Sequence, residues 1–168
     1  MLKHANVRDA LMLLDKQYRS AQGGGPSHLL IMYSKLALLE CCGWFEESFD
    51  EIVINSVRKK LRYVRDRKDL MQKIKSTHGF DYNTNFRPML VYGVGICKVL
   101  DIEKEMDRNG DLTVLKGVLG NLNSMRRVAA HTTSNGITQT FPDPATMLSY
   151  YNTTFPIIRR YWEIVGSN

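Results

Sequence analysis

Cysteine is scarce in this chain of 168 residues, which contains Cys41, Cys42 and Cys97. An odd number of thiols with an adjacent pair builds no disulfide framework, and their spacing matches no zinc site. We therefore expect reduced and mostly buried cysteines, the usual state in a cytoplasmic protein.

Long apolar runs are also absent. The longest stretch, from Leu29 to Trp44, contains Lys35 and Glu40, so it cannot span a bilayer. Charged residues likewise interrupt the segment from Met1 to Arg19, where a signal peptide needs a continuous apolar core. These absences predict a cytoplasmic protein that has no membrane partner.

Several motifs of metal and cofactor chemistry are missing. The three glycines at 23–25 are not followed by the Gly-Lys-Ser/Thr of a phosphate-binding loop. The sequence has no Gly-x-Ser-x-Gly, no His-Glu-x-x-His and no Cys-x-x-Cys, and its four histidines are dispersed. We therefore expect neither a metal site nor a cofactor.

Composition and length are those of an ordinary globular domain. Hydrophobic residues make up 43% of the chain and charged residues 24%, which argues against disorder. The length predicts one domain over residues 1–168. The formal net charge of +6 gives a moderate preference for a polyanionic partner.

Apolar residues recur at spacings of three and four along nearly the whole chain, which is the period of an amphipathic helix. Gly, Pro and Asx clusters separate these segments. The predicted helices are a first segment ending at Gly23, then approximately 27–59, 58–75, 88–106, 111–131 and 143–165. Gly93 and Gly95 fall inside an expected helix, and 78–88 is expected to be a loop.

No segment shows convincing strand alternation. The sequence therefore predicts an all-α fold, a single-domain antiparallel bundle of five or six helices.

One polar cluster has the residue types of phosphodiester chemistry. Arg126, Arg127 and His131 lie at the end of a predicted helix, with Arg127 four residues before His131 on the same face. Guanidinium binds phosphate through two parallel hydrogen bonds. An imidazole beside positive charge is kept neutral near neutral pH, so it can accept a proton. Such a cluster can bind a phosphodiester and move its protons.

A purely structural interpretation of these three residues is also open. Cations at a helix C-terminus interact favourably with the helix dipole, and His131 can cap exposed carbonyls.

The cluster resembles the Arg-x4-His motif of the HEPN superfamily, small all-helical domains of prokaryotic toxin and defence systems. The similarity includes the preceding apolar helix (Leu115, Leu119, Leu122 and Met125), the alanines before His131 and the polar turn after it.

The resemblance implies a HEPN-like fold and a metal-independent endoribonuclease that acts as a homodimer, with both motifs lining one cleft. His131 would transfer protons at the ribose 2′-hydroxyl and the leaving oxygen, and Arg126 would hold the phosphate. The product would carry a 2′,3′-cyclic phosphate. RNA is then the substrate, and an antitoxin or regulatory protein is a possible partner in toxin–antitoxin or antiphage defence.

Three further features leave alternatives open. Arg127 replaces the Asn, Asp or His that is frequent after the motif arginine, and either adds a second phosphate contact or leaves Arg126 less well oriented. Glu47, on the long second helix, either orients His131 or Arg126 or is simply solvated. The basic segment Arg58–Lys75 either binds an RNA backbone or is a solvated helix face.

The function predicted first is thus a HEPN-type endoribonuclease with His131 and Arg126 as catalytic residues and Arg127 and Glu47 as supporting residues. The alternative is a non-catalytic helical module that binds nucleic acid or a partner protein within a larger assembly, or that serves there as a structural subunit.

Overall fold

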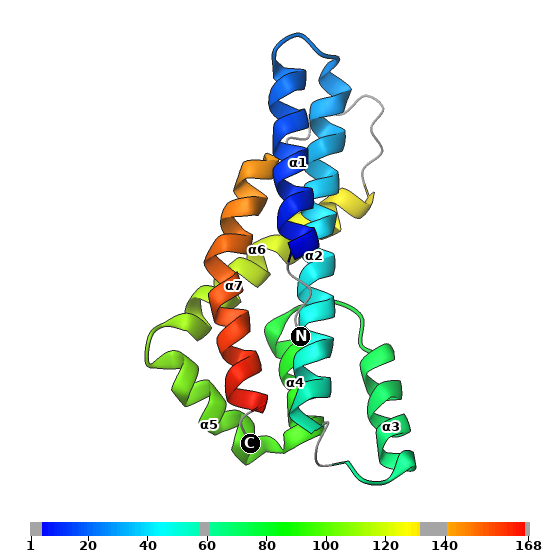
Figure 1. Cartoon of the computed structure of the whole chain (residues 1–168), viewed down its shortest axis with the longest axis vertical. Coiled ribbons are helices and arrows are strands. Elements are labelled where there is room, and N and C mark those ends of the chain that lie inside the picture. The colour runs from blue at the N-terminus through cyan, green and yellow to red at the C-terminus, as the bar shows by residue number, and fades with distance from the viewer. Residues whose placement is uncertain (1–4, 58–60, 132–140, 167–168) are drawn as a thin grey trace. The chain divides into compact units, whose positions relative to one another are not determined.

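The computed structural model describes residues 5–57, 61–131 and 141–166 of the chain. The described residues form seven α-helices and one short π-helix and contain no strand, which confirms the predicted all-α class (Figure 1). The elements are α1 (Ala5–Gln22), α2 (Ser27–Val57), α3 (Val64–Lys75), η1 (Tyr82–Phe86), α4 (Arg87–Val94), α5 (Ile96–Asp107), α6 (Asp111–His131) and α7 (Pro144–Gly166). No helix in this described part combines the length and the apolar character that crossing a membrane requires.

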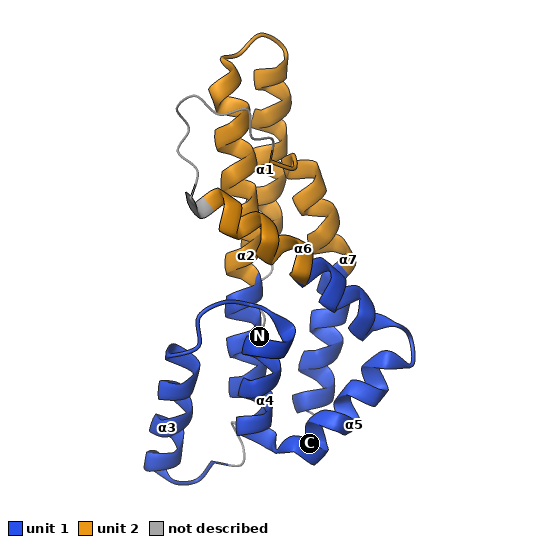
Figure 2. Ribbon diagram, turned by 180° about the vertical axis from the view of Figure 1, so that it is seen from behind, with its two compact units in different colours: residues 1–2, 45–119, 154–168 blue, residues 3–44, 120–153 orange. Residues whose placement is uncertain are grey.

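The chain divides into two compact units, shown in different colours in Figure 2. Unit 1 comprises residues 1–2, 45–119 and 154–168, and unit 2 comprises residues 3–44 and 120–153. Three helices, α2, α6 and α7, contribute residues to both units. The assignment of residues 1–168 to a single domain stays a prediction.

The prediction of five or six helices is wrong by at least one, and the reason is local. The helix expected over 88–106 is two helices, because Gly95 has φ +83° and ψ 156° and ends the α-helical backbone between α4 and α5. Such a conformation is open to glycine and strained for any residue with a Cβ atom.

The loop expected over 78–88 contains the π-helix η1. Asp81 caps it, since the Thr84 backbone N–H donates to Asp81 Oδ1 at 2.8 Å. The expected cap of the last helix is present: the Thr146 backbone N–H donates to Asp143 Oδ1 at 2.8 Å, and Pro144 is the first residue of α7.

Aromatic side chains fill the core of unit 1. The rings of Phe49 in α2 and Phe86 in η1 stack with their centroids 4.0 Å apart, and Phe45 stacks on Phe80. These four side chains are fully buried. Burial of such large rings contributes strongly to the stability of this unit.

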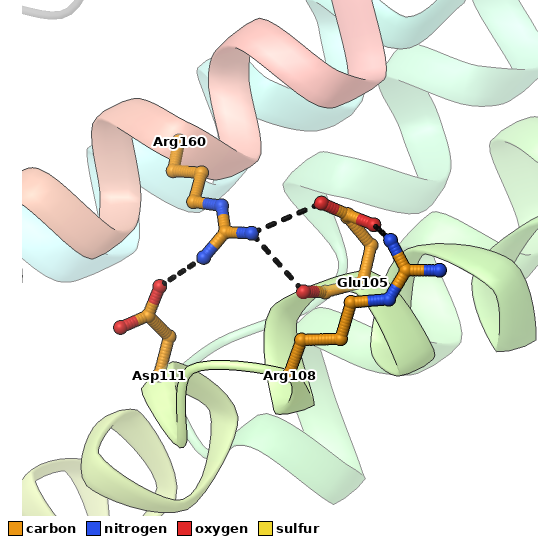
Figure 3. Close-up of polar contacts among 4 residues, drawn as sticks. All are labelled: Glu105, Arg108, Asp111 and Arg160. Carbon is orange, nitrogen blue, oxygen red and sulfur yellow. Dashed lines mark hydrogen bonds and ion pairs between the residues drawn. The ribbon is translucent and has the colours of Figure 1, made fainter.

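A charged network joins α5, α6 and α7 within unit 1 (Figure 3). Arg160 of α7 donates from Nη1 to Asp111 Oδ2 at 2.7 Å and from Nη2 to Glu105 Oε1 at 3.0 Å. Its Nη2 also donates to the Glu105 carbonyl oxygen, while Arg108 pairs with the same Glu105 side chain. One guanidinium thus connects the end of α5 to the start of α6.

In unit 2, α1 lies alongside the first half of α2 (Figures 1 and 2). Trp44 of α2 packs against Tyr151 of α7 with ring centroids 4.7 Å apart. Cys41 and Cys42 are buried in this unit, and burial raises the pKa of the Cys41 thiol. Cys97, which belongs to unit 1, is exposed.

Candidate functional site

The predicted motif lies on the last turns of α6. This helix is continuous from Asp111 to His131, so Arg127 and His131 occupy positions four apart on one helical face. Leu115, Leu119 and Leu122 of the same helix are buried, so the side of α6 that carries them faces the protein interior. The helical setting expected for the motif is therefore present.

The two arginines of the motif differ in exposure. Arg127 is exposed, whereas Arg126 is half-buried. Ala129, one of the alanines before His131, is buried. The side chains of Ala130 and His131 lie outside the described residues. Arg127 is therefore the more accessible of the two arginines.

Glu47, the predicted orienting carboxylate, is exposed on the part of α2 that belongs to unit 1. The motif residues Arg126 and Arg127 belong to unit 2. The role proposed for Glu47 toward them stays a prediction.

The neighbouring Asp50 is the carboxylate whose environment is most unusual. Burial, followed by the charges of Glu46 and Glu47, raises the pKa of Asp50 to about 6. The sequence shows these three carboxylates at helical spacing but does not show that Asp50 is the one turned inward. A carboxyl with a pKa of about 6 is partly protonated in mildly acidic solution.

The basic segment forms α3 from Val64 onward, and few of its apolar side chains are buried. Leu70 and Ile74 are buried, but Val64 and Met71 are exposed. Two cavities lie beside this helix within unit 1. One of about 320 Å³ is lined by Ile54, Val57, Leu61, Arg67, Leu70 and Met71, and one of about 230 Å³ is lined by Val57, Leu61, Asp66, Asp69, Leu70, Tyr92 and Gly93.

Two tyrosines of α7 are core residues. Tyr151 and Tyr161 are buried in α7, so neither presents a ring to a ligand. The described parts of the chain hold no group of three or more His, Cys, Asp and Glu side chains suited to binding a metal ion. Comparison of the chain with protein-family models, curated proteins and solved structures gave no match.

Proposed function

We propose that this protein is a metal-independent endoribonuclease of the HEPN type, acting as a homodimer in a toxin–antitoxin or antiphage defence system. The observation that supports the proposal most directly is the uninterrupted helix through His131. In this continuous helix Arg127 and His131 share one face, and Arg126, five residues before His131, lies about 140° around the helix from it.

The proposed reaction uses the nucleophile that RNA itself carries. One His131 removes the proton from a ribose 2′-hydroxyl, whose oxygen attacks the adjacent phosphorus. The bond from phosphorus to the 5′-oxygen breaks, and a second proton-bearing His131, supplied by the other protomer, protonates that leaving oxygen. The products are a 2′,3′-cyclic phosphate and a free 5′-hydroxyl.

The arginines are proposed to act on the phosphate. Arg126 holds its nonbridging oxygens and stabilises the negative charge that builds up in the transition state. Arg127, which is exposed, is placed to contact a second phosphate of the same strand.

The decisive experiment incubates the purified protein with RNA in the presence of EDTA. We expect cleavage by the parent protein, none by His131→Ala, and a loss of about 100-fold or more with Arg126→Ala. His78→Ala is the matched control, because His78 is an exposed histidine in unit 1. It should cleave like the parent.

Each other outcome has a definite meaning. Cleavage that persists in His131→Ala assigns the activity to another residue or to a contaminant. RNA that is retained but never cleaved by the parent protein favours the non-catalytic binding module. Expression in a bacterial host adds a second measurement, since growth arrest that Arg126→Ala relieves fits a toxin.

A further inference from the structure

The surplus of positive charge in this chain is concentrated in one segment. Residues 58–75 contain nine Lys and Arg residues and two Asp residues, which leaves 14 basic and 15 acidic residues elsewhere. Apart from this segment, the chain is therefore nearly neutral. Most of the described part of the segment is the helix α3 in unit 1.

The cations of α3 lie on its outer surface. Leu70 and Ile74 are buried, and Arg65, Lys68, Gln72 and Lys75 follow one another at spacings of three and four on the opposite side. We call Arg65, Lys68 and Lys75 the basic face. It extends over about 15 Å at a rise of about 1.5 Å per residue.

The two carboxylates of the helix do little to neutralise this face. Asp66 and Asp69 both line the cavity of about 230 Å³ beside α4. Arg65 reaches Asp69 at 3.9 Å, but its side chain is 91% exposed. Among the described residues, the side chains of Lys68 and Lys75 have no hydrogen-bond or ion-pair partner.

Stability of the helix does not account for the whole pattern. Lys75 in the last turn interacts favourably with the helix dipole, but Arg65 lies in the first turn, where positive charge is unfavourable. A ligand that carries a row of negative charges would offset this unfavourable interaction with the helix dipole.

An exposed aromatic ring lies close to the basic face in the sequence. Tyr63, the residue before α3 and two positions before Arg65, is 74% exposed. Tyrosine rings beside cations stack on the bases of a single strand while the cations contact its phosphates. An acidic peptide would engage the charges but offers no base to stack on the ring.

We propose that α3 is a binding surface for single-stranded RNA, in which the basic face contacts phosphates and Tyr63 stacks on a base. The choice of RNA rests on the proposed function, but the surface is separate from the motif of α6. It would supply substrate affinity and not chemistry.

The test measures binding to a labelled single strand of about 20 nucleotides over a range of salt concentrations. His131→Ala is the parent in this measurement, so that cleavage does not interfere. In that background, Lys68→Glu/Lys75→Glu should weaken binding by about tenfold or more and reduce the slope of log K against log salt concentration by about 1.4 for two lost phosphate contacts. The matched control is Lys16→Glu/Lys104→Glu, two exposed lysines whose replacement changes the net charge equally. It should stay within about twofold of its parent.

Further binding measurements decide the identity of the ligand. Tyr63→Ala should weaken RNA binding by about fivefold or more and leave the binding of polyglutamate unchanged. Any one of three results would overturn the proposal. These are equal losses of RNA binding in Lys68→Glu/Lys75→Glu and in the control, no RNA binding by the parent, and binding to polyglutamate as tight as binding to RNA. Lys68→Gln/Lys75→Gln, which adds no negative charge, should show a smaller loss of the same sign.

The same variants separate this proposal from the proposed function. In the cleaving protein, Lys68→Glu/Lys75→Glu should raise KM and leave kcat unchanged, whereas His131→Ala should abolish kcat without changing the Kd for RNA. RNA binding that depends on α3 in a protein that never cleaves would refute the nuclease and support the binding surface.

Discussion

The hydroxyl oxygens of Tyr82 and Tyr161 lie 3.1 Å apart in the core of unit 1, although the two residues are 79 positions apart in the chain. Tyr82 donates its proton to Glu103 Oε1 at 3.0 Å, so Tyr161 is the donor to Tyr82. Arg87 donates to both oxygens of Glu103. Burial raises the pKa of both tyrosines, and each stays protonated as a donor.

This relationship predicts unequal effects of removing the two hydroxyls. Tyr82→Phe leaves the buried Tyr161 hydroxyl without its acceptor and Glu103 without one donor, and should cost about 2–3 kcal/mol of unfolding free energy. Tyr161→Phe removes one bond and should cost about 1 kcal/mol. Urea denaturation measures both values, with Tyr92→Phe as an exposed control expected to change stability by less than about 0.5 kcal/mol. Equal costs for Tyr82→Phe and Tyr161→Phe would contradict the direction assigned to these hydrogen bonds.

The adjacent arginines 159 and 160 should differ sharply when replaced by methionine. Arg160, whose side chain is 25% exposed, bridges Asp111 and Glu105, so Arg160→Met should destabilise by about 1–3 kcal/mol by leaving partly buried carboxylates without their partner. Arg159 pairs with Glu163 at the surface with 65% of its side chain exposed, so Arg159→Met should cost less than about 0.5 kcal/mol. Thermal unfolding of the two variants provides the comparison. A larger loss for Arg159→Met would show that the network of Figure 3 does not stabilise unit 1.

Glycine to alanine substitutions at two positions should have opposite signs. Neither Gly95 nor Gly117 has a neighbouring atom within 4 Å of an added Cβ, so crowding does not decide the outcome. At Gly95 the positive φ makes alanine unfavourable by about 1–3 kcal/mol. At Gly117, inside α6, alanine should stabilise by about 0.5–1 kcal/mol. The free energies of unfolding of the two variants test this, and a stabilising Gly95→Ala would mean that α4 and α5 can join into one helix.

Asp50 should make the protein less stable as the pH rises. Its pKa is raised in the folded state from 3.8 to about 6, so the folded state binds the proton more tightly than the unfolded state does. The stabilisation that protonation provides is complete below the unfolded value and is lost as the pH rises through about 6. Asp50→Asn should therefore stabilise the protein by roughly 1 kcal/mol near neutral pH, a value reduced for solvent screening. The advantage should shrink as the pH falls from about 6 toward 4, which urea denaturation at several pH values measures. Glu40→Gln is the control, because Glu40 is an exposed carboxylate of the same helix that does not contribute to the shift of the Asp50 pKa. A pH-independent effect of Asp50→Asn would contradict the assignment.

Much of the helical pattern could be predicted from the sequence because its signals are local. The glycines before Pro26 end α1, and Asp143 with Pro144 starts α7, since capping and backbone restriction act over only a few residues. The break at Gly95 was missed because apolar residues continue at helical spacing on both sides of it. Only the conformation of that one residue distinguishes two helices from one.

The candidate site was predictable only to the level of the helix that carries it. Spacing alone places Arg127 and His131 on one face of α6. Contacts between distant segments are a different matter, as the Tyr82–Tyr161 pair and the raised pKa of Asp50 illustrate. They depend on tertiary packing, which the spacing of residues within a helix does not encode.

The placement of the cysteines gives this protein built-in reporters of local opening. An alkylating reagent needs an accessible thiolate, so Cys97 should react in the native state, whereas Cys41 and Cys42 should react when the interior of unit 2 becomes exposed. The rate at which Cys41 and Cys42 are alkylated then measures how often the interior of unit 2 opens, without any engineered probe. Unit 2 is also the unit that carries Arg126 and Arg127. Mass spectrometry of alkylated peptides, with and without RNA, would show whether bound RNA suppresses that opening.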